Sequence, residues 1–191
     1  MINKYTCLQN NFVQFSQYAI VPLRQESMTF IKEWRNAQID VLRQNKKLTD
    51  YDQRRYYIEV VSRGFNTLRP SEILFDILFN DALIGYGGLV HIDWENKGCE
   101  ISFLLNPARL ENKAIYEKDF SAFIEMIKKV GFKDLHFKKL WTETYDIRPH
   151  HVSILEKSGF KKVATKRNNN SIKGKLVDSL FHECLEVDYE K

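Results

Sequence analysis

The chain has few of the residues that mark fibrous, secreted or membrane proteins. Its 191 residues include 8 Gly, 4 Pro and 3 Cys, which excludes collagen-like and low-complexity classes. The scattered cysteines, Cys7, Cys99 and Cys184, form neither a disulfide framework nor a metal motif. The longest apolar runs, such as residues 73–79, fall far short of the roughly 20 residues of a membrane span. Because residues 1–12 also lack the apolar stretch of a secretion signal, we expect a cytoplasmic, reducing compartment and no membrane partner.

The composition otherwise fits one folded domain. Hydrophobic residues make up 43% and charged residues 28% of the chain, and its 13 Phe and 9 Tyr can fill a sizeable core. A net charge of +4 gives no reason to expect a nucleic-acid partner. The length favours a single domain over residues 1–191, with its core at about 19–187.

Hydrophobic periodicity predicts a mixed α/β chain. Short apolar runs indicate strands, and apolar residues at helical spacing indicate helices. The expected strands are 19–23, 72–79, 83–93, 99–105, 140–145, 160–165 and 178–187, and the expected helices are 28–36, 51–62, 116–130 and 149–158. The three strands from 72 to 105 form an antiparallel meander, and strand, helix and strand from 99 to 145 imply a right-handed parallel crossover.

Several residues are expected to set the ends of these elements. Ser27 is placed to cap the first helix with its side chain. Gly64, Gly131 and Gly159 follow helical patterns and are predicted to end them. The polar run 168–171 is predicted to be a loop between the last two strands.

The junction between strand 99–105 and the helix that follows it is a candidate anion site. Free N–H groups and the helix dipole attract anions to a helix N-terminus. Arg109 and Lys113 add positive charge at this junction. A phosphate group fits such a site, although a plain strand-to-helix connection has the same pattern.

Five segments in order along the chain resemble the GNAT superfamily of acetyl-CoA-dependent N-acetyltransferases. They are Trp34-Arg35-Asn36, the glycine-bearing strand 84–89, the Arg-x-x-Asn-x-Ala run of 109–114, the Ser-x-x-Glu-Lys-x-Gly-Phe run of 153–160, and residues 177–180. The resemblance covers residues 19–187 and is strongest to the branch that contains ribosomal-protein alanine and spermidine acetyltransferases. It implies the GNAT fold, a mixed central sheet with helices on both faces.

The resemblance also implies where acetyl-CoA binds. In the family, the backbone of one strand bonds the pantetheine arm, and the loop after it holds the pyrophosphate. Asn112 stands where the family has Gly, and Asn tolerates left-handed backbone angles. The implied cofactor-binding residues are Phe103, Leu104, Leu105, Arg109, Asn112, Lys113, Ala114, Ile115, Tyr116, His150 and Ser153.

Candidate catalytic residues are Glu100, Ser153 and Tyr145. Alternation along a strand places Glu100 and Ser102 on one face, and the resemblance places that face beside the acceptor amine. Glu100 is therefore the candidate base, directly or through water, although an ion-paired structural Glu fits equally well. The family's usual Tyr acid is replaced by Leu155. Ser153 is the replacement in the resembling branch, and Tyr145 is an alternative acid or substrate contact.

The candidate acceptor pocket is walled by Trp34, Arg35, Tyr56 and Tyr86. Aromatic rings suit stacking on a nucleobase, and a guanidinium suits a diphosphate, although aromatic residues at helical spacing also pack in cores. Trp34-Arg35-Asn36 and the polar, aromatic helix after it also resemble the nucleotide-sugar amine acetyltransferases of the same branch. The expected acceptor is therefore a small-molecule amine, preferably a nucleotide-linked amino sugar. The alternatives are a protein N-terminal acetyltransferase and a non-catalytic acyl-CoA-binding module. No metal is expected, because His91 and the other histidines lack metal-ligand spacing, and the protein is expected to be a monomer or homodimer.

Overall fold

The computed structural model describes residues 3–189, and within them the chain forms one mixed eight-stranded sheet in the order β1-β2-β3-β4-β5-β6-β8-β7. The strands are β1 Val13–Phe15, β2 Tyr18–Pro22, β3 Ile73–Phe79, β4 Ala82–Asp93, β5 Gly98–Leu105, β6 Lys139–Tyr145, β7 Lys161–Ile172 and β8 Lys175–Leu185. The helices are α1 Met28–Ala37, α2 Asp50–Tyr56, α3 Ser62–Gly64, α4 Lys113–Lys128, α5 Pro149–Lys157 and α6 Glu186–Tyr189. Residues 1, 2, 190 and 191 of the expected domain lie outside the described residues.

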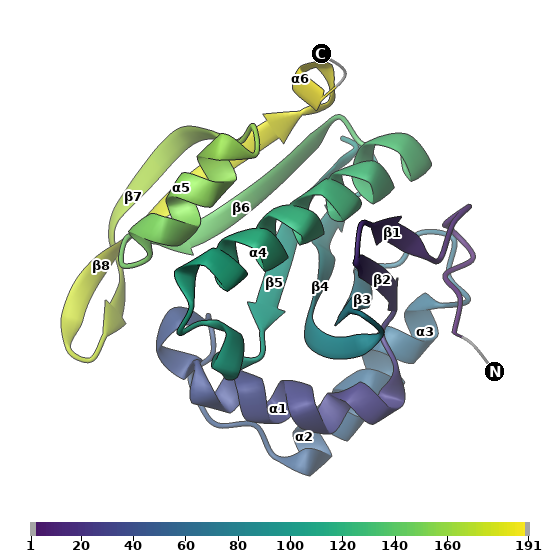
Figure 1. Cartoon of the computed structure of the whole chain (residues 1–191), viewed down its shortest axis with the longest axis horizontal. Coiled ribbons are helices and arrows are strands. Elements are labelled where there is room, and N and C mark those ends of the chain that lie inside the picture. Colours follow the sequence, from purple (N-terminus) through teal and green to yellow (C-terminus); the bar gives the residue numbers. More distant parts are fainter. Residues whose placement is uncertain (1–2, 190–191) are drawn as a thin grey trace.

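The predicted sheet topology is confirmed. β3, β4 and β5 pair antiparallel as a meander, and β5 pairs with β6 in parallel after the crossover through α4 (Figure 1). The structure adds β1, a short edge strand paired with β2, which the sequence pattern did not reveal. None of the helices in residues 3–189 is long and apolar enough to cross a membrane.

Helices cover both faces of the sheet. On one face the Phe103 ring of β5 packs against Phe120 and Phe123 of α4, with ring centroids 4.4 and 5.0 Å apart. On the other face, the hydroxyl of Tyr86 in β4 accepts a hydrogen bond of 2.6 Å from Arg35 in α1. Side chains of adjacent residues in a strand point to opposite faces. The same strands therefore place one set of side chains on the α4 face and a different set on the α1 face.

Gly87 lets β4 pass close to its neighbours. A Cβ atom at Gly87 would clash with the Ser102 carbonyl oxygen and would lie 2.8 Å from the Phe123 ring. The position therefore has to be a glycine if α4 is to pack tightly on the meander. This explains the glycine-bearing strand in physical terms.

β5 and β6 separate soon after they begin. Their pairing is confined to residues 98–100 of β5 and 139–141 of β6. Beyond these residues the two strands border a narrow opening of about 100 Å³, with Ser102 and Phe103 on one side and Thr142 and Thr144 on the other. The sheet thus has a gap near its centre, between Glu100 and the C-terminal ends of these strands.

Three predicted element boundaries are wrong. Ser27 makes no side-chain cap, because its hydroxyl donates to the buried Asp76 carboxylate at 2.8 Å. Gly131 does not end the long helix, since α4 continues into a wider π-helical segment, Lys129–Asp134. The polar run 168–171 is not a loop but part of β7. The pairing of β7 with β8 is irregular between Lys166 and Asn170, and it resumes at Asn170. Gly159 does follow the end of α5, with φ of 90°.

We predict that Gly87→Ala lowers the free energy of unfolding by about 2 kcal/mol, since overpacking a tight contact costs roughly 1–3 kcal/mol. Gly98→Ala is the matched control, because its Cβ would meet its nearest neighbour at an ordinary 3.5 Å. Urea denaturation of both variants measures the difference. Equal stability of the two variants would contradict the packing argument.

Candidate active site

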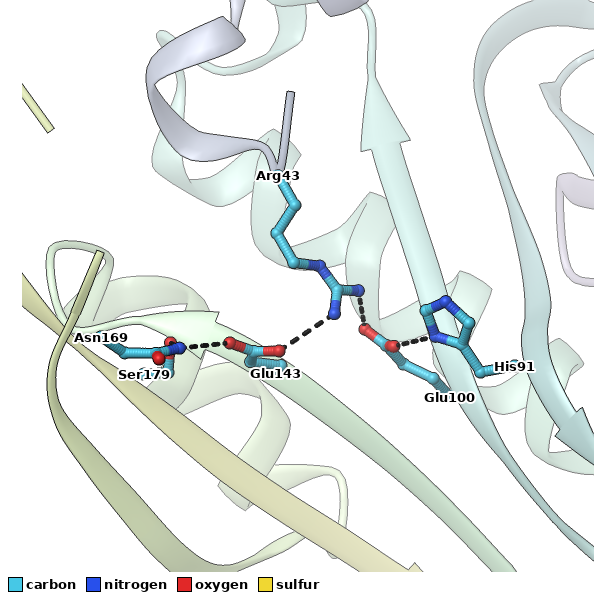
Figure 2. Close-up of polar contacts among 6 residues, drawn as sticks. All are labelled: Arg43, His91, Glu100, Glu143, Asn169 and Ser179. Atoms are coloured by element: carbon cyan, nitrogen blue, oxygen red, sulfur yellow. Dashed lines mark hydrogen bonds and ion pairs between the residues drawn. The ribbon is translucent and has the colours of Figure 1, made fainter. Parts of the chain in front are cut away.

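An arginine bridges the two strands that border the opening. Arg43 lies in the segment between α1 and α2, and its guanidinium binds Glu100 of β5 and Glu143 of β6 (Figure 2). The bond from Nη1 to Oε2 of Glu143 is 2.9 Å long, and the Glu143 carboxylate also accepts from Asn169 of β7. Glu100 is only 2% exposed, and a buried carboxylate needs such a partner.

The other carboxylate oxygen of Glu100 is hydrogen-bonded to a histidine. Nδ1 of His91 lies 2.7 Å from Oε2 of Glu100, and the ring lies nearly parallel to Trp141, at an interplanar angle of 13°. His91 has φ of 48° and stands where the pairing of β4 with β5 is interrupted between Val90 and Asp93. The irregularity aims the imidazole at Glu100, as bulges beside active sites often do.

A cavity of about 490 Å³ lies next to this pair. Arg35, Tyr56, Glu72, Tyr86 and His91 line it, together with Arg43 and Ser102. The Tyr56 hydroxyl donates to Glu72 at 2.7 Å, and Arg35 donates to Tyr86 and, at 2.9 Å, to Gln44. Burial raises the pKa of Glu72, although its hydrogen bond from Tyr56 opposes the shift. The cavity therefore combines two guanidinium groups with one partly buried carboxyl group.

A second cavity, of about 740 Å³, lies between residues 39–45 and the β7–β8 hairpin. Arg43 and Leu42 border this cavity, the 490 Å³ cavity and the opening between β5 and β6. Arg43 thus stands where the three spaces meet. A substrate that extends from one space into another has to pass its guanidinium.

The N-terminal ends of α4 and α5 lie together on the other side of the sheet (Figure 1). His150 contacts the Lys113 carbonyl oxygen at 3.2 Å, and Lys157 binds Glu117 at 2.8 Å. Ser153 stands between His150 and Lys157 at helical spacing and is exposed, so it shares the face that α5 turns toward α4. The neighbouring N-terminal ends of α4 and α5 therefore present an exposed surface that is mainly basic.

Asn112 acts here as a helix cap. Its side chain accepts hydrogen bonds from the amides of Ala114 and Ile115, at 3.0 and 3.2 Å. Its φ of −97° is extended rather than left-handed, so it does not use the conformation that a glycine at this place would offer. Asparagine is one of the preferred N-cap residues, and Asn112 caps α4 in the usual way.

A buried polar network borders the opening from the α4 side. Arg148 donates to the Tyr116 hydroxyl at 2.8 Å, and Nδ1 of His151 lies 2.7 Å from the same hydroxyl. Burial holds the pKa of His151 well below its ordinary value of 6.5, so the ring is neutral at pH 7. Tyr116 was expected to contact the cofactor, but its hydroxyl is engaged by these two side chains.

Arg109, expected to bind phosphate, is held elsewhere. Its guanidinium makes two bonds to the fully buried Asp119, of 2.5 and 2.8 Å, and lies over the Phe79 ring. Tyr18 donates to the same carboxylate at 2.9 Å. The arginine therefore compensates a buried charge between α4 and the sheet, and its side chain is not directed to an external anion.

The other predicted residues fall into separate environments. Arg35, Tyr56 and Tyr86 line the 490 Å³ cavity. Trp34 packs in the core at 7% exposure, and Tyr86, at 5%, belongs to the same core. Tyr145 borders the 740 Å³ cavity, and burial raises its pKa.

The β5 residues expected to bind the cofactor lie at or behind the opening. Phe103 borders the opening, whereas Leu104 and Leu105 are buried. The Leu105 carbonyl accepts a hydrogen bond of 2.8 Å from Gln38. Leu155 is fully buried, so no acid stands there.

Sequence reasoning missed Arg43, Glu72, Arg148 and His151, and it considered His91 only as a metal ligand. The basic character of Arg43 and Arg148 gives no sign of which carboxylate or hydroxyl they reach, since both lie in connecting segments. Among residues 3–189, no group of His, Cys, Asp and Glu side chains is arranged to hold a metal ion.

Comparisons with known proteins give one family and one fold. The sequence profile of a family described as "Acetyltransferase (GNAT) domain" matches residues 20–181. Searching curated protein sequences gives no significant match. The structure is similar to spermidine N-acetyltransferase from Vibrio cholerae in complex with CoA and spermine, with 17% identity, a TM-score of 0.79 and coverage of 93% of this chain and 100% of that one. A dodecameric form of the enzyme from the same organism gives 19% identity, a TM-score of 0.72 and coverage of 92% and 97%.

We predict that Arg109→Met lowers the free energy of unfolding by about 3 kcal/mol, because it leaves Asp119 buried without its cation. Removing both charges, in Arg109→Met/Asp119→Leu, is expected to recover at least half of that loss. Thermal or urea denaturation measures both, and calorimetry measures acetyl-CoA affinity. A stable Arg109→Met variant with at least tenfold weaker acetyl-CoA binding would contradict the structural role and restore the phosphate contact.

Proposed function

The chain belongs to the GNAT acetyltransferase family, and from this membership we propose that it acetylates the amine of a small acceptor that carries negative charge, preferably a nucleotide-linked amino sugar. As a family member it is an N-acetyltransferase with acetyl-CoA as its co-substrate. The open question is the acceptor. The charges around the 490 Å³ cavity support the proposal.

One observation carries this choice of acceptor: Arg35 is a cation without an anion. Its hydrogen bonds go to the neutral Tyr86 and Gln44, and within residues 3–189 no carboxylate pairs with it. The side chain is half-buried and lines the cavity. A half-buried guanidinium gains much from a carboxylate or phosphate in its fork geometry, so a negatively charged group of the acceptor supplies the missing partner.

The aromatic rings beside Arg35 support a nucleotide-linked acceptor. Tyr56 and Tyr86 both border the cavity, and their hydroxyls are already hydrogen-bonded. The partly buried Tyr56 ring, next to a guanidinium, suits a planar base linked to a diphosphate. The buried Tyr86 ring contributes through its bond to Arg35. The cavity volume is within the range of roughly 300–1,000 Å³ typical of small-molecule sites.

The donor side is proposed from the opening between β5 and β6. Phe103 borders this opening, and beyond residue 100 β5 has no partner strand on the β6 side, so its backbone there is free to bond an extended chain such as pantetheine. Lys113, His150 and Ser153 lie at the exposed N-terminal ends of α4 and α5, where a helix N-terminus and basic side chains suit phosphate. The thioester then reaches the opening from the α4 face, opposite the acceptor cavity.

This arrangement supplies what amide formation needs. Donor and acceptor enter from opposite faces and meet at the gap, which holds them in line. A proton acceptor, Glu100 with His91, lies at the acceptor end. Thiol release without a covalent enzyme intermediate is therefore expected, by direct attack in a ternary complex.

A polyamine is the second candidate, since Glu100 and Glu143 already hold a cation between them. Arg43 provides that cation, and the ammonium of a polyamine could take its place if the side chain moved. The similar Vibrio cholerae enzyme binds spermine. Against a polyamine, Glu100 and Glu143 already share the guanidinium of Arg43, whereas Arg35 has only the neutral partners Tyr86 and Gln44. A peptide N-terminus, the remaining acceptor, offers neither a ring nor fixed negative charge.

We predict a higher kcat/KM for glucosamine 1-phosphate than for glucosamine, and a higher value still for a UDP-linked amino sugar. Thiol release from acetyl-CoA measures all three, with spermidine and an alanyl peptide as the competing acceptors. Arg35→Gln is expected to raise the KM of the phosphorylated acceptor at least tenfold, equivalent to about 1.4 kcal/mol, and to leave the KM of acetyl-CoA unchanged.

Arg54→Gln, an exposed arginine on α2, is the matched control for loss of one positive charge. Faster acetylation of spermidine or of the peptide than of every phosphorylated amine would discard the anionic acceptor. No turnover with any amine, despite acetyl-CoA binding, would favour a non-catalytic acyl-CoA-binding module.

A further inference from the structure

We propose that His91 removes the proton from the acceptor amine, and that Glu100 is a positioning residue that orients the His91 ring. The inference rests on the proposed acetyl transfer and names the group that performs its proton step. It reassigns the role expected of Glu100 from the sequence.

Glu100 is poorly placed to take a proton itself. One of its oxygens binds Arg43, and the other binds Nδ1 of His91. Its side chain is only 3% exposed, whereas the side chain of His91 is 63% exposed, and His91, not Glu100, lines the 490 Å³ cavity. A base has to reach the proton that it removes. Glu100 borders the opening between β5 and β6 with both oxygens engaged, whereas His91 lines the acceptor cavity.

The tautomer of His91 follows from its partner. A carboxylate only accepts hydrogen bonds, so the proton between the two groups belongs to Nδ1 of His91. The neutral ring then carries its lone pair on Nε2, which is the nitrogen left for the substrate. Trp141 lies nearly parallel to the ring, with centroids 6.4 Å apart, and the bond to Glu100 sets the ring's orientation.

The backbone supports the same assignment. A left-handed conformation is uncommon for a residue other than glycine, yet His91 adopts it at φ of 48°, at the irregularity of β4. Such conformations cost energy and concentrate at functional sites. Here the conformation has an identifiable consequence, since it brings the imidazole to Glu100 at the border of the cavity.

Three charged groups lie around the ring. Glu100 from β5 binds its Nδ1, and Glu72, which precedes β3, lines the same cavity. Arg43, from the segment after α1, binds the other oxygen of Glu100. The ring is therefore held by a carboxylate whose second oxygen is already engaged.

The proposed transfer conserves protons and bonds. Nε2 of His91 takes one proton from the acceptor ammonium and leaves a neutral amine. The amine nitrogen forms its bond to the acetyl carbon, and the bond from that carbon to the CoA sulfur breaks. The nitrogen's second proton ends on the sulfur, so free thiol leaves. His91 returns its own proton to water, and the sum is amide, thiol and one released proton.

The test begins with His91→Asn and His91→Gly, both of which accept a left-handed backbone. With acetyl-CoA and glucosamine 1-phosphate, kcat is expected to fall on the order of 10²-fold or more, with the KM of acetyl-CoA within twofold of its original value. Added imidazole is expected to restore turnover to His91→Gly, in proportion to its unprotonated fraction. Lys97→Asn and Lys97→Gly are the matched controls, because Lys97 is another left-handed residue, at φ of 55°, in the turn that joins β4 and β5.

Glu100→Gln separates positioning from proton transfer. It is expected to lower kcat, and imidazole is not expected to rescue it, because the His91 ring still occupies its place. If His91→Asn keeps full turnover, or if imidazole restores Glu100→Gln but not His91→Gly, the assignment is wrong.

A measurement without turnover distinguishes failure of this inference from failure of the proposed function. In the unchanged protein, the ¹⁵N shifts of the His91 ring are expected to show a protonated Nδ1 and an unprotonated Nε2 at pH 8. Glu100→Gln is expected to weaken that preference. A ring protonated on Nε2 would overturn the assignment whatever the acceptor proves to be, whereas absent turnover with the expected tautomer would count against the proposed acceptor alone.

Discussion

The separation of β5 from β6 is the constraint on which the candidate site depends. Continuous pairing would fill the middle of the sheet with backbone hydrogen bonds, but the two strands pair only as far as Glu100 and Trp141. From there the gap joins the α4 face to the α1 face through the sheet. Arg43 spans it by binding one carboxylate on each strand, so the gap is held by charge where it lacks a backbone ladder.

Buried carboxylates and their partners arrange the elements around this gap. Asp119 ties α4 to the loop before it through Arg109 and to β2 through Tyr18. Asp76 of β3 accepts from Ser27 and Arg24, which fixes the start of α1. A buried charge without its partner is costly, so these contacts restrict how the helices lie on the sheet. Arg35 differs because its partners are neutral, so its charge is left for an anionic group of the acceptor.

The sequence predicted elements better than it predicted contacts. Apolar periodicity is a local property, so it located the meander, the crossover and α5 with its Pro149 and Gly159 to within a few residues. The same reasoning placed Ser27 as a cap and Arg109 on phosphate, because spacing does not reveal which buried carboxylate a side chain meets. His91 shows the limit most clearly, since the interruption of β4 that aims it at Glu100 has no signature in the surrounding residues.

A crystal structure with CoA and glucosamine 1-phosphate tests the central claim most directly, namely that donor and acceptor meet at the gap from opposite faces. The account predicts the CoA sulfur in the opening between Phe103 and Thr142, the amine beside Nε2 of His91 and the phosphate at the guanidinium of Arg35. A sulfur atom elsewhere on the sheet, or an amine held between Glu100 and Glu143 with the phosphate away from Arg35, would contradict it.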